Sequence, residues 1–178
     1  MFIKYFKLII ILLFFYQNPL YSKSNDLKDF NPDYFSGVVA YKNKNNSDAL
    51  GFFKSSKILL NKHDPYLEKY IHSLVVEGKV RQAVNEINQN LNKNNSRFFE
   101  ARLILAIDNL KKKDFKKSKI YLEQSYEFIN NNRISLFIYE SIKQYIYTFQ
   151  EGKILKTKNN FGDLSLINKI FLNCYLDN

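Results

Sequence analysis

Few residues in this 178-residue sequence have the types and spacing that active sites and metal centres require. The two histidines, His63 and His72, have no cysteine or carboxylate near them at the spacing of a zinc ligand set. The sequence also has no phosphate-binding loop, no G-x-S-x-G elbow and no H-E-x-x-H helix. We therefore expect no catalytic residue, no metal and no cofactor, and a site assembled from residues far apart in the sequence is the alternative.

The single cysteine, Cys174, cannot form a disulfide within the chain. Its neighbours Ile170, Phe171, Leu172 and Tyr175 form an apolar stretch with helical spacing. This setting favours a buried, unreactive thiol, and an intermolecular or reactive role is the alternative.

The formal net charge of +10 raises the question of a nucleic-acid partner. The lysines, however, are scattered along the whole chain among many Asn and Ile residues. The longest basic run, residues 111–113, falls where the pattern predicts a turn, and such short runs are usually solvated. We therefore expect no nucleic acid among the partners.

The first 24 residues differ from the rest of the chain. Lys4 and Lys7 precede an apolar and aromatic run at 8–16, and Asn18-Pro19 and small residues at 22–24 follow. This order is typical of a secretory signal peptide. The alternative is an uncleaved signal anchor, with residues 2–20 as a membrane tether whose lysines reach the interface. In both cases we expect the remainder, after a linker at 25–32, to be periplasmic or secreted, or anchored to the inner membrane and facing the periplasm.

Three later stretches of the sequence resemble one another, because in each a small residue is followed four positions later by a large apolar one. The pairs are Ala49 and Phe53, Ala83 and Ile87, and Ser118 and Leu122. The small residues lie 34 and 35 positions apart. Helices joined by a short turn approach closely only where a small side chain lies at the crossing, and residue i+4 shares its face. The spacing therefore predicts a repeated helix pair, with an ordinary helical bundle as the alternative.

The hydrophobic pattern is helical along the rest of the chain. Apolar residues recur at helical intervals, and no stretch alternates with period two for long enough to form a strand. Asp64, Ser96 and Asp114 are placed to cap helix N-termini, and Gly78 and Gly152 to end helices. We therefore predict an all-α fold.

These features resemble the tetratricopeptide repeat (TPR), a helix–turn–helix unit of 34 residues. Gly37, Ala49 and Phe53 match the family's Gly, Ala and aromatic positions, and Gly78 and Ala83 match its turn Gly and following Ala. The resemblance covers residues 33–150. Within it the chain is similar to the divergent repeats of exported alphaproteobacterial proteins, although the family's Trp is absent. It implies a right-handed solenoid of antiparallel helix pairs behind the apolar leader helix. The residues expected to pack the repeats are Gly37, Ala49, Phe53, Gly78, Ala83, Ile87, Ser118 and Leu122.

In this family the first helices of the pairs line a concave groove that holds a segment of a partner protein. By alignment of the units those helices are 33–42, 66–77, 98–110 and 134–150. The resemblance implies the following groove residues: Tyr34, Val38, Tyr41, Glu68, His72, Val75, Leu103, Ile107 and Lys111. For each of them a place in the core is the alternative. The apolar and aromatic mixture suits an amphipathic or extended apolar segment.

The resemblance thus implies a non-catalytic extracytoplasmic adaptor or scaffold that binds other proteins of the cell envelope, with no small-molecule ligand. An accessory subunit or small envelope enzyme, and a membrane-anchored structural bundle, are the alternatives. Residues 151–178 are predicted as a loop and a final unpaired amphipathic helix at 163–175. Because repeat arrays usually need a cap at each end, we also expect this chain to be a fragment or shortened form of a longer repeat protein.

Overall fold

The computed structural model describes residues 31–177, so the predicted leader at 1–24 and most of the linker lie outside the described residues. Within 31–177 every regular element is helical, which confirms the all-α prediction. The α-helices are α2 (Asn31–Lys42), α3 (Asn46–Ser55), α4 (Pro65–Val76), α5 (Val80–Gln89), α6 (Phe99–Lys111), α7 (Phe115–Ser125), α8 (Arg133–Glu151) and α9 (Asp163–Leu176). Short 3₁₀ turns are η1 (Lys57–Asn61), η2 (Asn94–Ser96) and η3 (Tyr126–Phe128).

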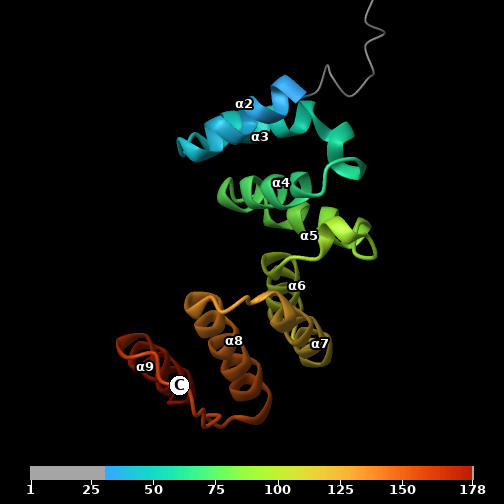
Figure 1. Ribbon diagram of the computed structural model, residues 1–178. Coiled ribbons are helices and arrows are strands. Elements are labelled where there is room, and N and C mark those ends of the chain that lie inside the picture. Colours follow the sequence, from blue (N-terminus) through green and yellow to red (C-terminus); the bar gives the residue numbers. More distant parts are fainter. Residues whose placement is uncertain (1–30, 178) are drawn as a thin grey trace, which may run out of the picture.

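The helices follow one another in space in chain order, with α2 and α9 at opposite ends (Figure 1). The bounds of α2, α4, α6 and α8 agree within two residues with the four first helices that the sequence predicts. None of the helices at 31–177 is both long enough and apolar enough to cross a membrane.

The turns α2–α3, α4–α5 and α6–α7 share one backbone geometry. Each contains a left-handed residue: Lys44, Gly78 and Lys113 have φ of 61°, 71° and 60°. The next residue in each turn donates its N–H to the carbonyl five positions back, which is the 6→1 hydrogen bond of a Schellman motif. These bonds join Asn45 to Ala40 (2.9 Å), Lys79 to Leu74 (2.8 Å) and Asp114 to Asn109 (2.9 Å). The same helix ending therefore recurs at intervals of 34 and 35 residues.

The predicted helix caps are confirmed at some positions and wrong at others. Asp114 accepts a hydrogen bond from the backbone N–H of Lys117 at 3.0 Å, and Gly152 ends α8 with φ 64°. Ser96 does not cap α6, because its hydroxyl donates to backbone carbonyls behind it and α6 begins only at Phe99. Asp64 makes no capping bond either, because it has helical dihedral angles itself.

Two clusters of buried residues form the core of the described chain. The first extends from α2 to α6 and is centred on aromatic side chains, of which Phe53, Tyr66 and Tyr70 are almost fully buried. The second extends from α6 to α8 and contains Leu122 and Ile146. The two clusters meet on α6, which supplies buried residues to both.

The small residues of the repeated pattern lie where neighbouring helices touch. Ala49, Ala83 and Ser118 are fully buried, as are their apolar partners four positions later. The Ser118 hydroxyl also donates to the carbonyl of Ala106 on α6 at 2.7 Å, which links α7 to α6. On α2, a Cβ placed on Gly37 would lie 3.0 Å from the ring of Phe53, so α2 approaches α3 too closely for a larger residue.

The last helix, α9, packs against the preceding helix, α8. Phe149 of α8 and Tyr175 of α9 have ring centroids 4.4 Å apart. Asn168 and Leu172 of α9 are buried against α8. The opposite face of α9, which includes Ile167 and Ile170, is exposed.

Candidate functional site

An open groove of about 720 Å³ lies between the α4–α5 turn and α6, and we call it the α5–α6 groove. Its lining residues are Val75, Val80, Arg81, Val84, Asn85, Ile104, Ile107, Asp108, Lys111 and Lys112. The left-handed Gly78 reverses the chain so that Val75 and Val80 both reach the groove from one side. Val80 and Ile107 are 46% and 43% exposed, so apolar surface from two helices faces solvent here.

The rim of the α5–α6 groove is basic. Lys112 forms an ion pair with Asp108 at 2.5 Å, one turn away on the same helix. Among the described residues, Arg81 and Lys111 have no carboxylate within ion-pairing distance. The groove therefore offers an apolar floor beside two cations that are available to an acidic group.

Three of the predicted groove residues come together in the α5–α6 groove, namely Val75, Ile107 and Lys111. Tyr41 of α2 and His72 of α4 form a second group, with ring centroids 5.1 Å apart at 89°. Glu68, His72 and Val75 share one face of α4, because they are four and three positions apart.

The other predicted groove residues lie in the core or against it. Tyr34 is 7% exposed and its ring packs among Phe53, His63 and Tyr66. Val38 is half-buried against the first cluster and Leu103 against the second. Burial also raises the pKa of the Tyr34 phenol, which therefore stays protonated.

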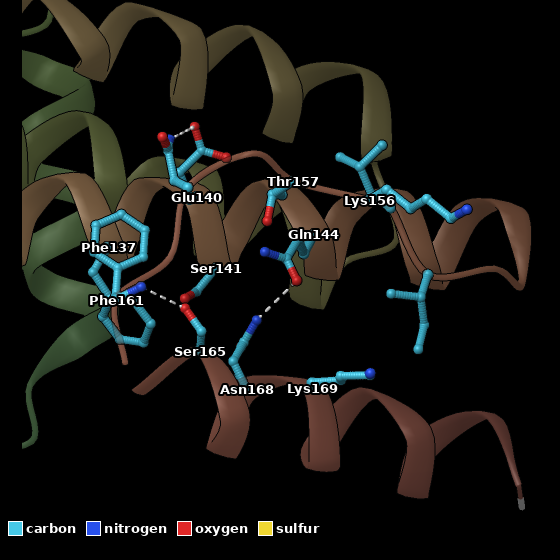
Figure 2. A pocket seen from close by; sticks show the side chains of 13 residues that line it. Phe137, Glu140, Ser141, Gln144, Lys156, Thr157, Phe161, Ser165, Asn168 and Lys169 are labelled. Atoms are coloured by element: carbon cyan, nitrogen blue, oxygen red, sulfur yellow. Dashed lines mark hydrogen bonds between the residues drawn. The ribbon is translucent and has the colours of Figure 1, made fainter. Parts of the chain in front are cut away.

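A second, polar pocket of about 370 Å³ lies between α8, the following loop and α9 (Figure 2). The Asn168 side chain points across it and donates to Gln144 Oε1 at 3.0 Å, whereas its Oδ1 has no hydrogen-bond partner. The backbone N–H of Phe161 donates to Ser165 Oγ at 2.8 Å and holds the loop against α9. Sequence reasoning missed this pocket, because its lining combines residues of α8 and α9 with residues of an Asn- and Lys-rich loop that has no periodicity.

No family model, curated protein or solved structure matches this chain. The resemblance to the tetratricopeptide repeat thus rests on the residues of the chain and stays a prediction.

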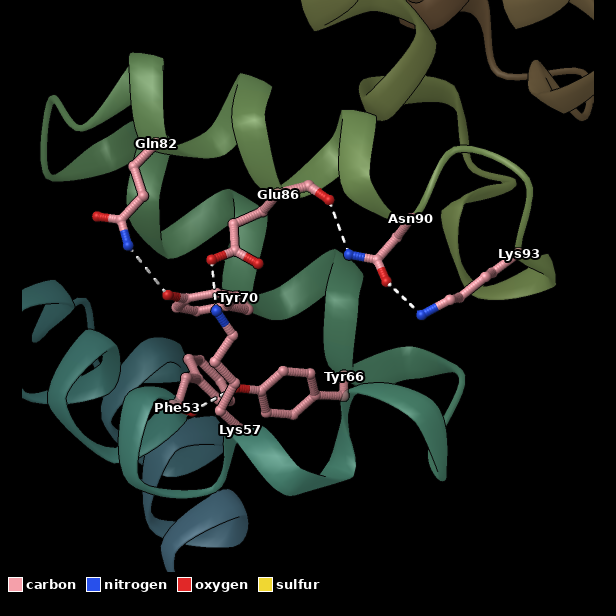
Figure 3. A network of polar contacts seen from close by, with 8 residues as sticks. All are labelled: Phe53, Lys57, Tyr66, Tyr70, Gln82, Glu86, Asn90 and Lys93. Atoms are coloured by element: carbon pink, nitrogen blue, oxygen red, sulfur yellow. Dashed lines mark hydrogen bonds and ion pairs between the residues drawn. The ribbon is translucent and has the colours of Figure 1, made fainter.

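An ion pair between an exposed lysine and a buried glutamate links η1 to α5 (Figure 3). Lys57 Nζ lies 2.5 Å from Glu86 Oε1, and the Glu86 side chain is 8% exposed. The hydrogen bond from Lys57 to Glu86 raises the pKa of this lysine, which keeps the lysine charged. Gln82, one turn before Glu86, donates to the Tyr70 phenol at 3.3 Å.

This network joins helices and has no arrangement suited to catalysis. Burial raises the pKa of the Tyr66 and Tyr70 phenols, which remain protonated and act as hydrogen-bond donors or acceptors. Tyr66 Oη donates to the backbone carbonyl of Phe53, which ties α4 to α3. Sequence reasoning missed the Lys57–Glu86 pair, although a signal was present: Glu86 lies next to Ile87 on the buried stripe of α5.

The residues considered first for chemistry do not converge. His63 packs edge-on against Tyr34 with ring centroids 4.8 Å apart, and His72 contacts Tyr41 instead. No group of three or more His, Cys, Asp and Glu side chains in the described chain could hold a metal ion. The prediction that Cys174 is buried is wrong, because it is exposed on α9, both faces of which carry apolar residues.

Proposed function

We propose that this protein is a non-catalytic adaptor that binds an amphipathic segment of a partner protein in the α5–α6 groove. The observation that carries the proposal is the combination of solvent-exposed apolar side chains with unpaired cations in one groove. Apolar contacts to Val80 and Ile107 would supply most of the affinity. Arg81 and Lys111 would select a segment with an acidic residue beside its apolar ones, because opposite charges across an interface favour the correct partner.

The wider architecture that we propose is a right-handed solenoid of TPR-like helix pairs. The recurring turn supports it, since left-handed residues at Lys44, Gly78 and Lys113 end α2, α4 and α6 in the same way. In such a solenoid the first helices of the pairs face one surface. The shared face of Glu68, His72 and Val75 on α4 would then extend the α5–α6 groove towards Tyr41 on α2.

We further propose that the chain is exported and works in the cell envelope, facing the periplasm. The support is the order of basic, apolar and small residues at 1–24. Mass spectrometry of the N-terminus of the protein isolated from cells tests this. A new N-terminus near residues 22–25 indicates a cleaved signal, and an intact Met1 in the membrane fraction indicates an anchor; an intact N-terminus in the cytoplasm contradicts export.

The groove is tested by site-specific photo-crosslinking of the full chain in cells. A photoreactive residue replaces either Ile107 in the groove or Ile120 on α7, which is equally exposed at 43% and lies outside the groove. We expect one discrete protein adduct from position 107 and none of that mass from position 120.

Charge reversal then distinguishes binding of a specific partner from non-specific association. Arg81→Glu with Lys111→Glu should remove the adduct, because both cations line the groove. Lys116→Glu with Lys119→Glu on α7 changes the net charge equally and should leave it. The proposal fails if both double variants behave alike, or if positions 107 and 120 give the same adducts.

A further inference from the structure

The polar pocket between α8, the loop at 152–162 and α9 contains a buried polar atom without a partner (Figure 2). Asn168 is 4% exposed and points across the pocket, where its amide nitrogen donates to Gln144 Oε1 at 3.0 Å. Its Oδ1 has no hydrogen-bond partner among the described residues. Folded proteins seldom bury an acceptor in this state, because the atom has given up its hydrogen bonds to water. Asn168 Oδ1 therefore indicates a hydrogen-bond donor that occupies the pocket.

The pocket has the size and the lining of a small-molecule site. Its volume of about 370 Å³ falls within the range of roughly 300–1,000 Å³ that is typical of such sites. The rings of Phe137 and Phe161, with centroids 5.4 Å apart, form one end of it (Figure 2). Ile154 and Leu155 of the loop add further apolar surface. Apolar walls with a few placed polar groups suit an organic molecule that carries both kinds of surface.

The pocket carries opposite charges at its two ends. Glu140 lies beside the phenylalanine pair, and Lys156 and Lys169 lie towards the other end (Figure 2). Within the described chain none of the three has an opposite charge at ion-pairing distance. Asn159 of the loop donates to Glu140 Oε1 at 3.4 Å, and a carboxylate can accept further hydrogen bonds. A ligand with an ammonium group at one end and a carboxylate at the other would match both ends.

The spacing of these charges indicates the length of the ligand. The contacts of Phe161 with Phe137 and of Asn168 with Gln144 show that α9 runs parallel to α8. Lys169 therefore lies one turn or slightly more beyond Glu140, which is roughly 6–8 Å along the helix axes. An extended peptide spans about 3.3–3.6 Å per residue, so two residues cover this offset and a single amino acid does not. Asn168 lies between the two ends, level with the peptide bond of such a ligand.

We propose that this pocket binds a free dipeptide with an apolar first residue. Glu140 binds the terminal ammonium, Lys169 and Lys156 bind the terminal carboxylate, and Asn168 Oδ1 accepts the peptide N–H. The first side chain of the ligand packs against Phe137 and Phe161. The sequence predicted no small-molecule ligand for this chain, and the unpaired atom of Asn168 is the observation that changes this expectation. This inference does not depend on the proposed adaptor function.

Isothermal titration calorimetry of the purified full chain tests the site. The probes are alanylalanine, leucylleucine and phenylalanylalanine, each compared with its N-acetylated and C-amidated form, which carries neither charge. We expect at least one dipeptide to bind at one site per chain, and its blocked form to bind at least about tenfold more weakly. Free leucine and free phenylalanine should also bind more weakly, because they cannot reach both ends. The proposal is overturned if no dipeptide binds at millimolar concentration, as when water alone fills the pocket, if the blocked form binds equally well, or if a free amino acid binds more tightly.

Substitutions at the two ends locate the binding in this pocket. Glu140→Gln keeps the shape of the side chain and removes its charge, so it should weaken the free dipeptide at least about tenfold and leave an N-acetylated dipeptide unaffected. Lys169→Gln should do the same for the free dipeptide and leave a C-amidated one unaffected. Glu100→Gln, at an exposed position of α6 outside the pocket, is the matched control and should change none of these affinities. Equal behaviour of Glu140→Gln and Glu100→Gln contradicts the assignment of the ligand to this pocket.

Discussion

Replacing Gly37 by alanine should destabilise the protein, whereas the same change at Gly51 should stabilise it. Both glycines lie inside helices, α2 and α3 respectively. A Cβ on Gly51 would have no neighbour within 4 Å. A Cβ on Gly37 would lie 3.0 Å from Phe53 Cε1 and 3.2 Å from Phe52 Cβ.

The size of the effect follows from the mobility of the Phe53 ring. Phe53 is fully buried, and its ring is 5.9 Å from that of Tyr34 and 6.2 Å from that of Tyr66, so it cannot move aside freely. Overpacking a rigid core of this kind costs about 1–3 kcal/mol. Alanine in place of glycine inside a helix gains about 0.5–1 kcal/mol. We expect Gly37→Ala to lower the free energy of unfolding by about 0.5–2 kcal/mol and Gly51→Ala to raise it by about 0.5–1 kcal/mol.

Urea unfolding of the full chain, followed by far-UV circular dichroism, measures both changes. Because the two substitutions gain the same helix propensity, the difference between them isolates the contact between α2 and α3. If Gly37→Ala stabilises the protein as much as Gly51→Ala does, the close packing of these helices is refuted.

Three further predictions concern the polar groups. Asn132→Ala should cost about 1 kcal/mol, because Asn132 caps α8, while Asp64→Ala, at a helix start without a capping bond, should leave the urea midpoint unchanged. Lys57→Ala should lower the free energy of unfolding by about 1–3 kcal/mol, because it leaves the Glu86 carboxylate buried without its partner; Lys57→Met with Glu86→Leu should recover part of this loss. Burial raises the pKa of Tyr66 above its ordinary value of 10.0, so the folded state holds this proton more tightly and stability should fall as the pH rises beyond 10. Thermal melts across this range should show a shallower fall for Tyr66→Phe.

The helices could be predicted from the sequence because their signals are local. Apolar spacing located α4 and α6. Gly78 marked one turn because the backbone is left-handed there, and Asp114 marked another because it caps the helix that follows. Ser96 does not cap α6, because its hydroxyl donates hydrogen bonds to backbone carbonyls of the preceding turn. Such competition depends on how the loop closes, and the spacing of residues does not encode it.

The candidate site could be predicted only in part, because it depends on which face of each helix meets its neighbours. Val75 and Ile107 fall into one groove as the unit alignment suggests, but Tyr34 is drawn into the aromatic core by Phe53 and Tyr66. Cys174 was misplaced for a related reason. Both faces of α9 are apolar, so hydrophobic spacing alone could not say which one packs.

The sharing of α6 between the two core clusters makes this helix the mechanical link between the two halves of the stack. Leu105 belongs to the first cluster and Ala106 to the second, so adjacent residues of one helix are anchored in different halves of the stack. The α5–α6 groove opens beside this same helix. Because one continuous helix is anchored in both clusters, a substitution that unpacks α6 would loosen both halves of the stack together, and they would unfold as one cooperative unit.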